Sequence, residues 1–399
     1  MIGYGSVVLF ASMPDPFSLQ NFFSPGYTVS LIIFTATFAL FSLGLNLQWG
    51  FTGLINFGHV AFMTVGAYTT VLLSLQGVPI VIATLVGAVL AALLGLVLGA
   101  TTLRLREDYL SIVTIGASEV IRLIALNEEW LTRGALGVPI SVQYLPLGFL
   151  TRPTLVTRVG MVLWWTALFG VAGWQFWLWL RRGSDRPTKD GLEKSSISPS
   201  KLLWGGVTAI SGLLLYFIGT IAILDYAKYG YKVGLMLLLV TVLEFVYWRL
   251  EVSVKSPWGR VLKSIREDEQ VAKALGKNVF WYKLQSLMLG GAIAGIAGAF
   301  YAWNLTFINP DGFIPLITFH AWIIVVLGGS GNNAGTLLGA AIFWLYSTVT
   351  RFVLPAIVPL DDARLGALRI MVIGLLLIIL MMVRPQGILG KKEELTLGR

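Results

Sequence analysis

Long apolar runs constrain this chain more than any other feature of its sequence. Crossing lipid takes about 20 apolar residues per helix, because a helix pairs its own backbone groups and an unpaired amide in hydrocarbon is costly. The sequence therefore predicts an all-α fold, a polytopic transmembrane helical bundle of about ten spans plus one short broken or re-entrant helix. We expect the spans at residues 28–48, 55–75, 79–103, 109–126, 161–180, 202–224, 233–250, 284–303, 336–352 and 366–383.

The broken helix is expected in the second half of the chain. A short apolar piece, Phe319–Leu327, is followed by a stretch rich in Gly and Asn at 328–335. A similar interruption lies at 50–59 in the first half. Gly-interrupted segments in both halves are typical of transporter sites, where helix ends offer free backbone groups to a polar substrate. Close helix packing is the alternative interpretation, and both remain open at this point.

The distribution of charge indicates membrane topology rather than nucleic-acid binding. The chain has a net charge of +9, yet residues 1–103 contain no Lys or Arg, and basic residues then gather between the apolar runs. Positively charged loops of this kind are retained in the cytoplasm. We expect cytoplasmic segments at 104–106, 181–201, 251–283 and 384–399, and external segments at 127–160 and 225–232.

We expect a single transmembrane domain over residues 1–399. The polar segment 181–201 is rich in Gly, Ser and Pro, which predicts a flexible cytoplasmic linker, and 384–399 is expected to be a cytoplasmic tail. The N-terminal stretch lacks the basic region of a cleaved signal peptide, so we expect it to be retained.

Few ionisable side chains lie inside the predicted spans. Glu119 and Arg122 are three residues apart and share a helix face, where a paired charge costs much less than an isolated one. They are either a pathway or gating pair or a structural ion pair. The two histidines, His59 and His320, have no ligand at metal-binding spacing, and the chain has no Cys. We therefore expect no metal and no cofactor, and a hydrogen-bonded packing role for each histidine.

Sequence motifs for nucleotide hydrolysis and for hydrolytic catalysis are missing. The chain contains no G-x-x-x-x-G-K-[ST], no G-x-S-x-G and no H-E-x-x-H. We interpret it as a transport subunit rather than an enzyme, with any ATP site on another polypeptide. An ion-coupled secondary transporter and a membrane-embedded enzyme remain alternatives, but both predict intramembrane ionisable or nucleophilic groups that are scarce here.

The charged segment 251–283 has an apolar side. Val261, Leu262 and Ile265 share one helix face, and a second short helix is predicted to end at Gly276. A solvated basic loop needs no apolar face, whereas a helix that docks into a partner's groove does. We therefore expect this loop to bind a cytoplasmic partner.

The loop also carries a family resemblance. Residues 256–284, SPWGRVLKSIREDEQVAKALGKNVFWYKL, closely resemble the ATPase-coupling loop of LivM-type permeases, the membrane subunits of ABC importers for branched-chain and neutral amino acids. Further motifs of this family occur in the family's order over about residues 55 to 390. The chain departs from the family pattern in the external loop, where Arg133 follows Thr132. The insert at 181–200 most resembles the cyanobacterial neutral amino-acid permease subgroup NatD. The other motifs are GLINFGHVAFMTVGAY (53–68), IGASEVIRLIALN (115–127), VVLGGSGNNAGTLLGAAI (325–342) and RPQGILG (384–390).

The resemblance implies a multi-pass protein of the bacterial inner membrane. Its expected partners are a second related permease in a heterodimer, two cytoplasmic ATPase subunits, a periplasmic or lipoprotein solute-binding protein and the lipid bilayer, with no nucleic acid. A permease of the same family that carries urea or another small solute remains an alternative. The implied ATPase-coupling residues are Arg260, Arg266, Glu267, Asp268 and Gly276. The candidate substrate-pathway residues are Asn56, Gly58, His59, Gly328, Gly329, Gly331, Asn332, Asn333 and Gly335.

Overall fold

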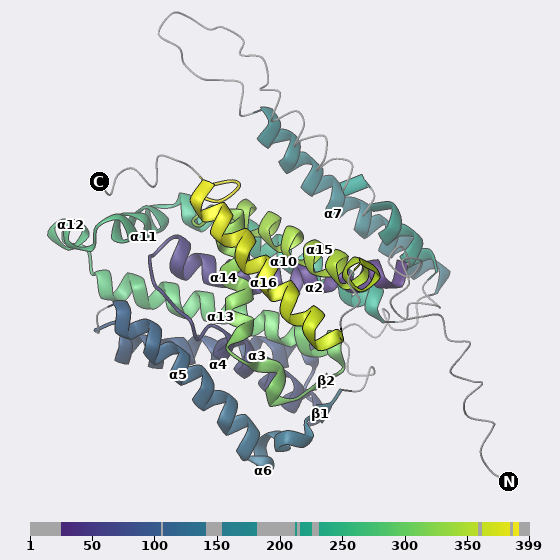
Figure 1. Ribbon diagram of the computed structural model, residues 1–399, viewed down its shortest axis with the longest axis horizontal. Helices are drawn as coiled ribbons and strands as arrows, with labels where there is room; N and C mark the ends of the chain where they lie inside the picture. Colours follow the sequence, from purple (N-terminus) through teal and green to yellow (C-terminus); the bar gives the residue numbers. More distant parts are fainter. Residues whose placement is uncertain are drawn as a thin grey trace, which may run out of the picture.

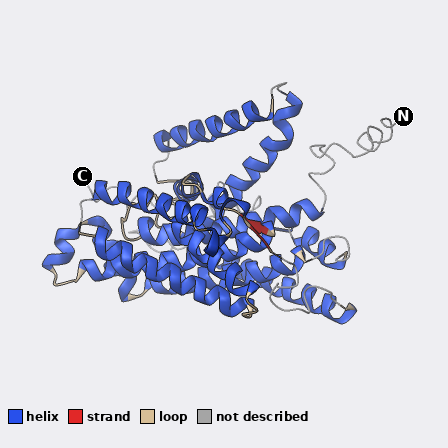
Figure 2. Ribbon diagram, turned by 90° about the horizontal axis from the view of Figure 1, so that it is seen from below, coloured by secondary structure: helices blue, strands red, loops and turns tan. Residues whose placement is uncertain are grey.

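The chain folds into a helical bundle, in which one short strand pair is the only sheet among the described residues (Figures 1 and 2). The computed structural model describes residues 25–104, 107–140, 154–181, 212–213, 216–225, 231–357, 361–383 and 386–390. Within them, nine helices are long and apolar enough to cross a membrane. This confirms the predicted all-α polytopic membrane fold.

Four helices pack at the centre of the bundle, and glycine lets their backbones approach closely. A Cβ built on Gly66 would lie 2.2 Å from the carbonyl oxygen of Gly295, and one on Gly95 would lie 3.0 Å from the Cα of Met288. Close backbone approach of this kind is the usual role of small residues between membrane helices. The central helices are α2 (Pro25–Leu45), α3 (Val60–Leu75), α4 (Ile80–Thr102) and α13 (Val279–Leu305).

The remaining long helices surround this centre, and α7 lies at the edge of the bundle (Figure 1). Several of them expose large apolar side chains, as Leu163 on α7 and Met382 on α16 show. Such faces suit lipid or a second membrane subunit. The outer helices are α5 (Glu107–Asn127), α7 (Leu155–Arg181), α10 (Lys232–Lys255), α14 (Leu316–Gly328), α15 (Asn333–Ile357) and α16 (Asp362–Val383).

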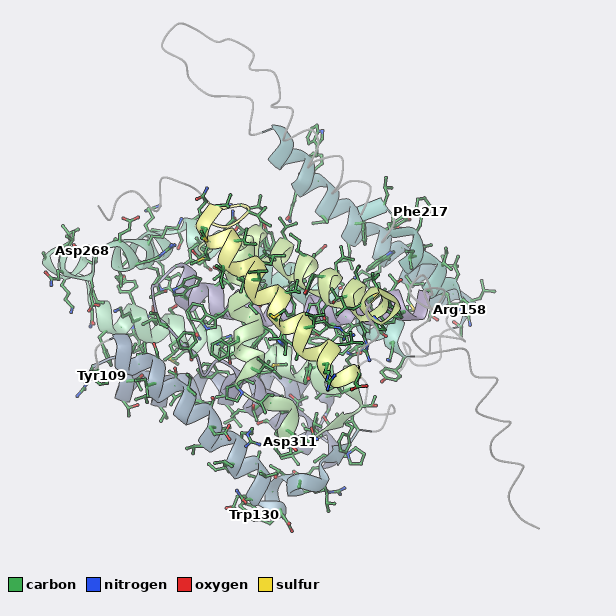
Figure 3. The ribbon with its side chains drawn as sticks, viewed as in Figure 1. Tyr109, Trp130, Arg158, Phe217, Asp268 and Asp311 are labelled. Carbon is green, nitrogen blue, oxygen red and sulfur yellow. The ribbon has the colours of Figure 1, made fainter. Side chains whose placement is uncertain are left out.

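Short elements occupy the two ends of the bundle. Figure 3 places Tyr109 and Asp268 toward one end, and Trp130 with Asp311 toward the other. The first end carries α11 (Pro257–Glu267) and α12 (Glu269–Ala274). The second end carries α6 (Glu129–Thr132), a 3₁₀ turn Gly134–Leu136, β1 (Val138–Pro139), β2 (Phe307–Ile308) and a 3₁₀ turn Pro310–Phe313, with β1 and β2 antiparallel.

The second predicted span is shorter than expected. We expected a helix over 55–75, but residues 51–59 are not helical and α3 begins only at Val60. The Val60 amide donates to the Thr318 hydroxyl on α14 (2.9 Å), so a neighbouring helix satisfies the first turn. Most of the expected span at 202–224, the linker at 181–201 and the tail at 384–399 lies outside the described residues.

Candidate functional site

The structure confirms both predicted helix interruptions. In the first, α2 passes into a π-helical turn, Asn46–Gly50, and residues 51–59 have no regular helix. In the second, α14 ends at Gly328 and α15 begins at Asn333. Gly53, Gly329 and Gly331 have φ angles of 80°, 113° and 75°, a left-handed region that favours glycine. We refer to residues 46–59 as the first break and residues 328–333 as the second break.

Asn46 joins the two breaks directly. Its Oδ1 accepts a hydrogen bond from the Gly331 amide (2.9 Å), and its Nδ2 donates to the Oδ1 of Asn333 (3.1 Å). Asn46 and Asn333 are both buried. The Asn333 Nδ2 in turn donates to Glu251 on α10 (3.1 Å), whose carboxylate pairs with Lys255 (2.6 Å). A polar chain therefore runs from the first break through the second break to the last turns of α10.

A second polar cluster fastens the first break to α13. Gln48 donates from Nε2 to the Leu287 carbonyl (3.1 Å) and accepts from the Asn56 Nδ2 (2.9 Å). The Oδ1 of Asn56 accepts from the Gly58 amide (2.9 Å), so both ends of this amide are engaged within the protein. Thr52 and Ser286 share a further hydrogen bond (2.8 Å). Buried amides of this kind hold an irregular backbone in one conformation.

Three predicted pathway glycines lie where backbones nearly touch. A Cβ on Gly58 would lie 1.8 Å from the Thr114 carbonyl oxygen of α5. A Cβ on Gly328 would lie 1.9 Å from the Gly335 carbonyl oxygen, and one on Gly335 would lie 2.5 Å from the Gly328 oxygen. Larger residues would force these segments apart, because the atoms they would meet belong to the backbone.

The chain segment 386–390 covers the second break. The amides of Ile388 and Leu389 donate to the carbonyls of Leu327 and Gly328 (3.0 Å each), which are among the free carbonyls at the end of α14. Asn332 donates to the Leu389 carbonyl (2.8 Å) and accepts from the Gly335 amide (3.1 Å). Residues 386–390, the described part of the RPQGILG motif, therefore cap the broken helix.

The two histidines are packed among aromatic rings. His59 is fully buried, and its Nε2 lies 3.1 Å from the Phe41 carbonyl oxygen. The centroids of the His59 and Phe41 rings are 4.7 Å apart. His320 packs against Phe38 and Phe343. Among the described residues, no three His, Asp or Glu side chains gather as a possible metal site.

The predicted ion pair lies on α5 and has a third member. Arg122 contacts Glu119 at 2.6 Å and also reaches Asp311, in the 3₁₀ turn Pro310–Phe313, at 3.2 Å. These contacts tie α5 to the turn that precedes α14, at the Trp130 end of α5 (Figure 3). Among the described residues, these ion pairs join the cluster to neither break.

The loop over α11 and α12 lies against the first break. The Arg266 guanidinium donates to the Gly50 carbonyl and, at 3.5 Å, to the Ser330 hydroxyl, and the Lys263 Nζ lies 5.7 Å from the Phe51 ring centroid. Asp268 caps α12 by accepting from two of its amides. Arg260, Glu267 and Asp268 are exposed, whereas Arg266 is half-buried, and Gly276 ends the loop with φ 74°.

Glu269 fixes α12 to α13. Its carboxylate pairs with Lys273 (2.7 Å) and with the largely buried Lys283 (2.6 Å). Burial opposes ionisation, but hydrogen bonds and charge from the two lysines outweigh it and hold the pKa of the Glu269 carboxyl below its ordinary value. Arg266 and Glu269, on either side of the junction between α11 and α12, therefore fix the middle of the loop to the bundle.

Sequence reasoning missed three members of this site: Asn46, Gln48 and Glu251. Asn46 and Gln48 were included in an apolar run, although two amides next to Gly50 mark an expensive position inside a membrane helix. Glu251 was assigned to the charged loop. Its contact with Asn333 depends on how α10 and α15 pack, which no local pattern shows.

Comparison with known proteins identifies a matching family. The family model described as "branched-chain amino acid transport system / permease component" matches residues 27–381. The LivM permease of the Escherichia coli K12 high-affinity branched-chain amino acid transport system is 28% identical over 363 residues, which cover 91% of this chain and 70% of LivM. No solved structure matches the chain at a significant level.

Two proteins of one further organism extend this comparison. A probable branched-chain amino acid transport permease protein, LivM, of Methanocaldococcus jannaschii is 25% identical over 379 residues, covering 92% of this chain and 94% of that protein. The probable LivH permease of the same organism is 26% identical over 196 residues, 47% of this chain and 60% of LivH.

Proposed function

The chain belongs to the family of branched-chain amino acid transport permeases, and we propose that it is the membrane-spanning permease of an ABC importer for neutral or branched-chain amino acids. Transport is driven by ATP hydrolysis on separate subunits. The chain contributes the membrane pathway and has no ATP site of its own.

One observation supports this proposal beyond the family match. Two helix breaks, far apart in the sequence, are hydrogen-bonded to each other through Asn46 and Gly331, and the amphipathic α11 contacts both of them through Arg266. Irregular backbone at membrane depth persists where protein or a water-filled cavity satisfies it. A partner that moves α11 would thus act directly on the irregular segments.

The partners follow from this arrangement. One of the two ATPase subunits docks on the exposed side of α11 and α12, where Val271 and Leu275 present apolar side chains to solvent. A second, LivH-like permease completes the pathway, and a solute-binding protein delivers the amino acid from outside. In this proposal the two breaks, with the pathway residues named from the sequence, face the substrate when the pathway opens.

A second part of the proposal concerns the range of substrates. The neutral amino-acid preference rests on the resemblance of the insert at 181–200 to the NatD subgroup, and that insert lies outside the described residues. The family match favours an amino acid over urea, because the two LivM relatives compared above are described as branched-chain amino acid transport permeases.

The test is uptake in proteoliposomes that contain this chain, the second permease, both ATPases and the solute-binding protein. Labelled leucine should accumulate only with ATP inside, and unlabelled alanine and valine should compete while urea does not. The chain purified alone should not hydrolyse ATP. Leucine uptake driven by an ion gradient without the ATPases would contradict the proposal, and so would uptake of urea alone.

The orientation can be tested separately, because the chain has no native Cys. In intact cells, an impermeant maleimide should label a Cys placed at Ser141 and not one placed at Ser195. Equal labelling of the two cysteines would contradict the proposed cytoplasmic location of residues 181–201.

A further inference from the structure

Arg266 lies in the last turn of α11 on the side that faces the bundle. Its Nη1 donates to the carbonyl of Gly50, the last residue of the π-helical turn, and its Nη2 lies 3.5 Å from the Ser330 hydroxyl in the second break. One guanidinium therefore touches both breaks. A side chain engaged in this way is not available to an external subunit in the same conformation.

Other residues of α11 also face the bundle. Lys263, three residues before Arg266 and so on the same helix face, is directed at the Phe51 ring. Gly53 lies beneath the helix, because a Cβ built there would be 3.5 Å from the Cα of Arg266. The apolar anchors Leu262 and Ile265 are buried. The helix therefore rests on the first break along its bundle-facing side.

Arg260 carries the same charge on the same helix as Arg266, but its side chain is exposed to solvent. Its guanidinium reaches only as far as the Lys255 carbonyl at the end of α10 (3.4 Å). Together with the exposed Glu267, Val271 and Leu275, it leaves an outer side of the loop free for a partner. The loop thus has an outer side on which a partner can dock and an inner side formed by Arg266 and Lys263.

We infer that Arg266 is a positioning residue that ties the coupling helix to both helix breaks, rather than a contact to the ATPase. The planar guanidinium presents donors in a fixed fork, so it holds two acceptors at a set separation. When ATP binding shifts α11, Gly50 and Ser330 are displaced together. Asn46 already bonds the first break to Gly331, so the two breaks move as a unit. This inference rests on the proposed function and assigns a transmission step within it.

The experiment uses the complete importer in proteoliposomes with Arg266→Ala, Arg266→Lys and Arg260→Ala. Arg249→Ala serves as the matched control, because Arg249 is an exposed arginine on α10 that lies over the Trp248 ring. Three quantities are measured: the amount of ATPase that co-purifies, the rate of ATP hydrolysis and the rate of amino-acid uptake.

Arg266→Ala should retain the ATPases and continue to hydrolyse ATP, while uptake falls by about tenfold or more, in the range typical of coupling between sites. Arg266→Lys should recover only part of the uptake, since an ammonium lacks the guanidinium fork. Arg260→Ala should instead reduce the amount of bound ATPase. Arg249→Ala should behave as the unmodified importer does.

A direct readout of the breaks comes from Ser330→Cys, which places Sγ where Oγ accepts from Arg266. In inverted vesicles without ATP, maleimide should label this Cys several times faster when Arg266 is Ala than when it is Arg. Loss of the ATPases from Arg266→Ala would overturn the inference, and so would unchanged uptake with unchanged labelling. If the unmodified importer neither binds ATPases nor takes up leucine, the proposed function itself fails.

Discussion

Asn46 and Gly331 lie 285 positions apart in the chain, yet the Gly331 amide donates to the Oδ1 of Asn46 at 2.9 Å. The same side chain donates to Asn333, so one buried side-chain amide satisfies two groups within the second break. A Cβ on Gly50 would lie 2.5 Å from the Gly331 nitrogen, which shows how closely the first break approaches the second. Each of these groups would be costly if unpaired at membrane depth.

Replacing Asn46 by Ala should destabilise the bundle. The change leaves the Gly331 amide and the side-chain Oδ1 of Asn333 unpaired in a buried site, which costs about 1–3 kcal/mol for each group. Thermal unfolding of the purified chain in detergent should shift downward, and uptake by the assembled importer should fall. Asn127→Ala is the matched control, because that amide is exposed and donates only to Leu123 of its own helix. Equal unfolding temperatures for the two variants would contradict the role of Asn46.

Replacing Gly331 by Val should abolish most uptake. With φ at 75°, residue 331 adopts a left-handed conformation that costs other residues about 1–2 kcal/mol, and more for a β-branched side chain. Gly116→Ala on α5 is the control, because a Cβ there meets nothing within 4 Å. It should be neutral or slightly stabilising, since helical Ala is favoured over Gly by about 1 kcal/mol.

Co-purification of the second permease separates two explanations for a loss of uptake. If Gly331→Val assembles normally but does not transport, the second break acts in the pathway. If the variant no longer binds the second permease, the glycine serves packing.

Glu269→Gln should release α12 from α13. The substitution removes the charge of one carboxylate that pairs with the largely buried Lys283, and weakening the pairing of a buried charge is unfavourable. Proteolysis within 268–278 should become faster in the variant, measured on the purified chain at neutral pH. Lys277→Gln, which has no ion pair among the described contacts, is the control.

The same carboxylate predicts a pH dependence. The pKa of Glu269 is lower in the folded chain than in the unfolded chain. Its contribution to the stability of the folded segment is therefore fully present above the ordinary pKa of a glutamate, and it is lost as pH falls through the lower, folded pKa. Protection of α12 should therefore decrease at acidic pH in the wild-type chain and change less in Glu269→Gln. If the protection of α12 depended on pH in the same way in the wild-type chain and in Glu269→Gln, another titrating group would control this helix.

Local sequence patterns were sufficient for most of the membrane helices that the structure describes and for the position of both breaks. Runs of apolar residues set the spans, while Gly53, Gly329 and Gly331 marked conformations that other residues adopt at a cost. The start of α3 was wrong by five residues, because Leu54, Ile55 and Phe57 are apolar without being helical. Hydropathy cannot distinguish a helix from an extended buried segment.

Long-range pairing could not be predicted in the same way. Asn46 and Gln48 are single polar residues within an apolar run, and their partners lie on α13, α15 and the second break. Arg266 was assigned from the family resemblance to ATPase coupling, but its direction within the loop depends on how α11 packs against residues 50–53. Such relationships follow from tertiary packing and not from local periodicity.

Asn56→Ala addresses the proposed pathway most directly. The Asn56 amide is buried, donates to Gln48 and accepts from Gly58, and its backbone carbonyl accepts from the Trp322 indole (3.1 Å). If the first break meets substrate when the pathway opens, removing the amide should change the rate of uptake or the relative uptake of leucine, valine and alanine, while the second permease still co-purifies. Thr101→Ala, an exposed hydroxyl bonded within α4, controls for loss of a side-chain hydrogen bond. Unchanged uptake of all three amino acids by Asn56→Ala would restrict this residue to holding the backbone of the first break, and the pathway would have to lie elsewhere.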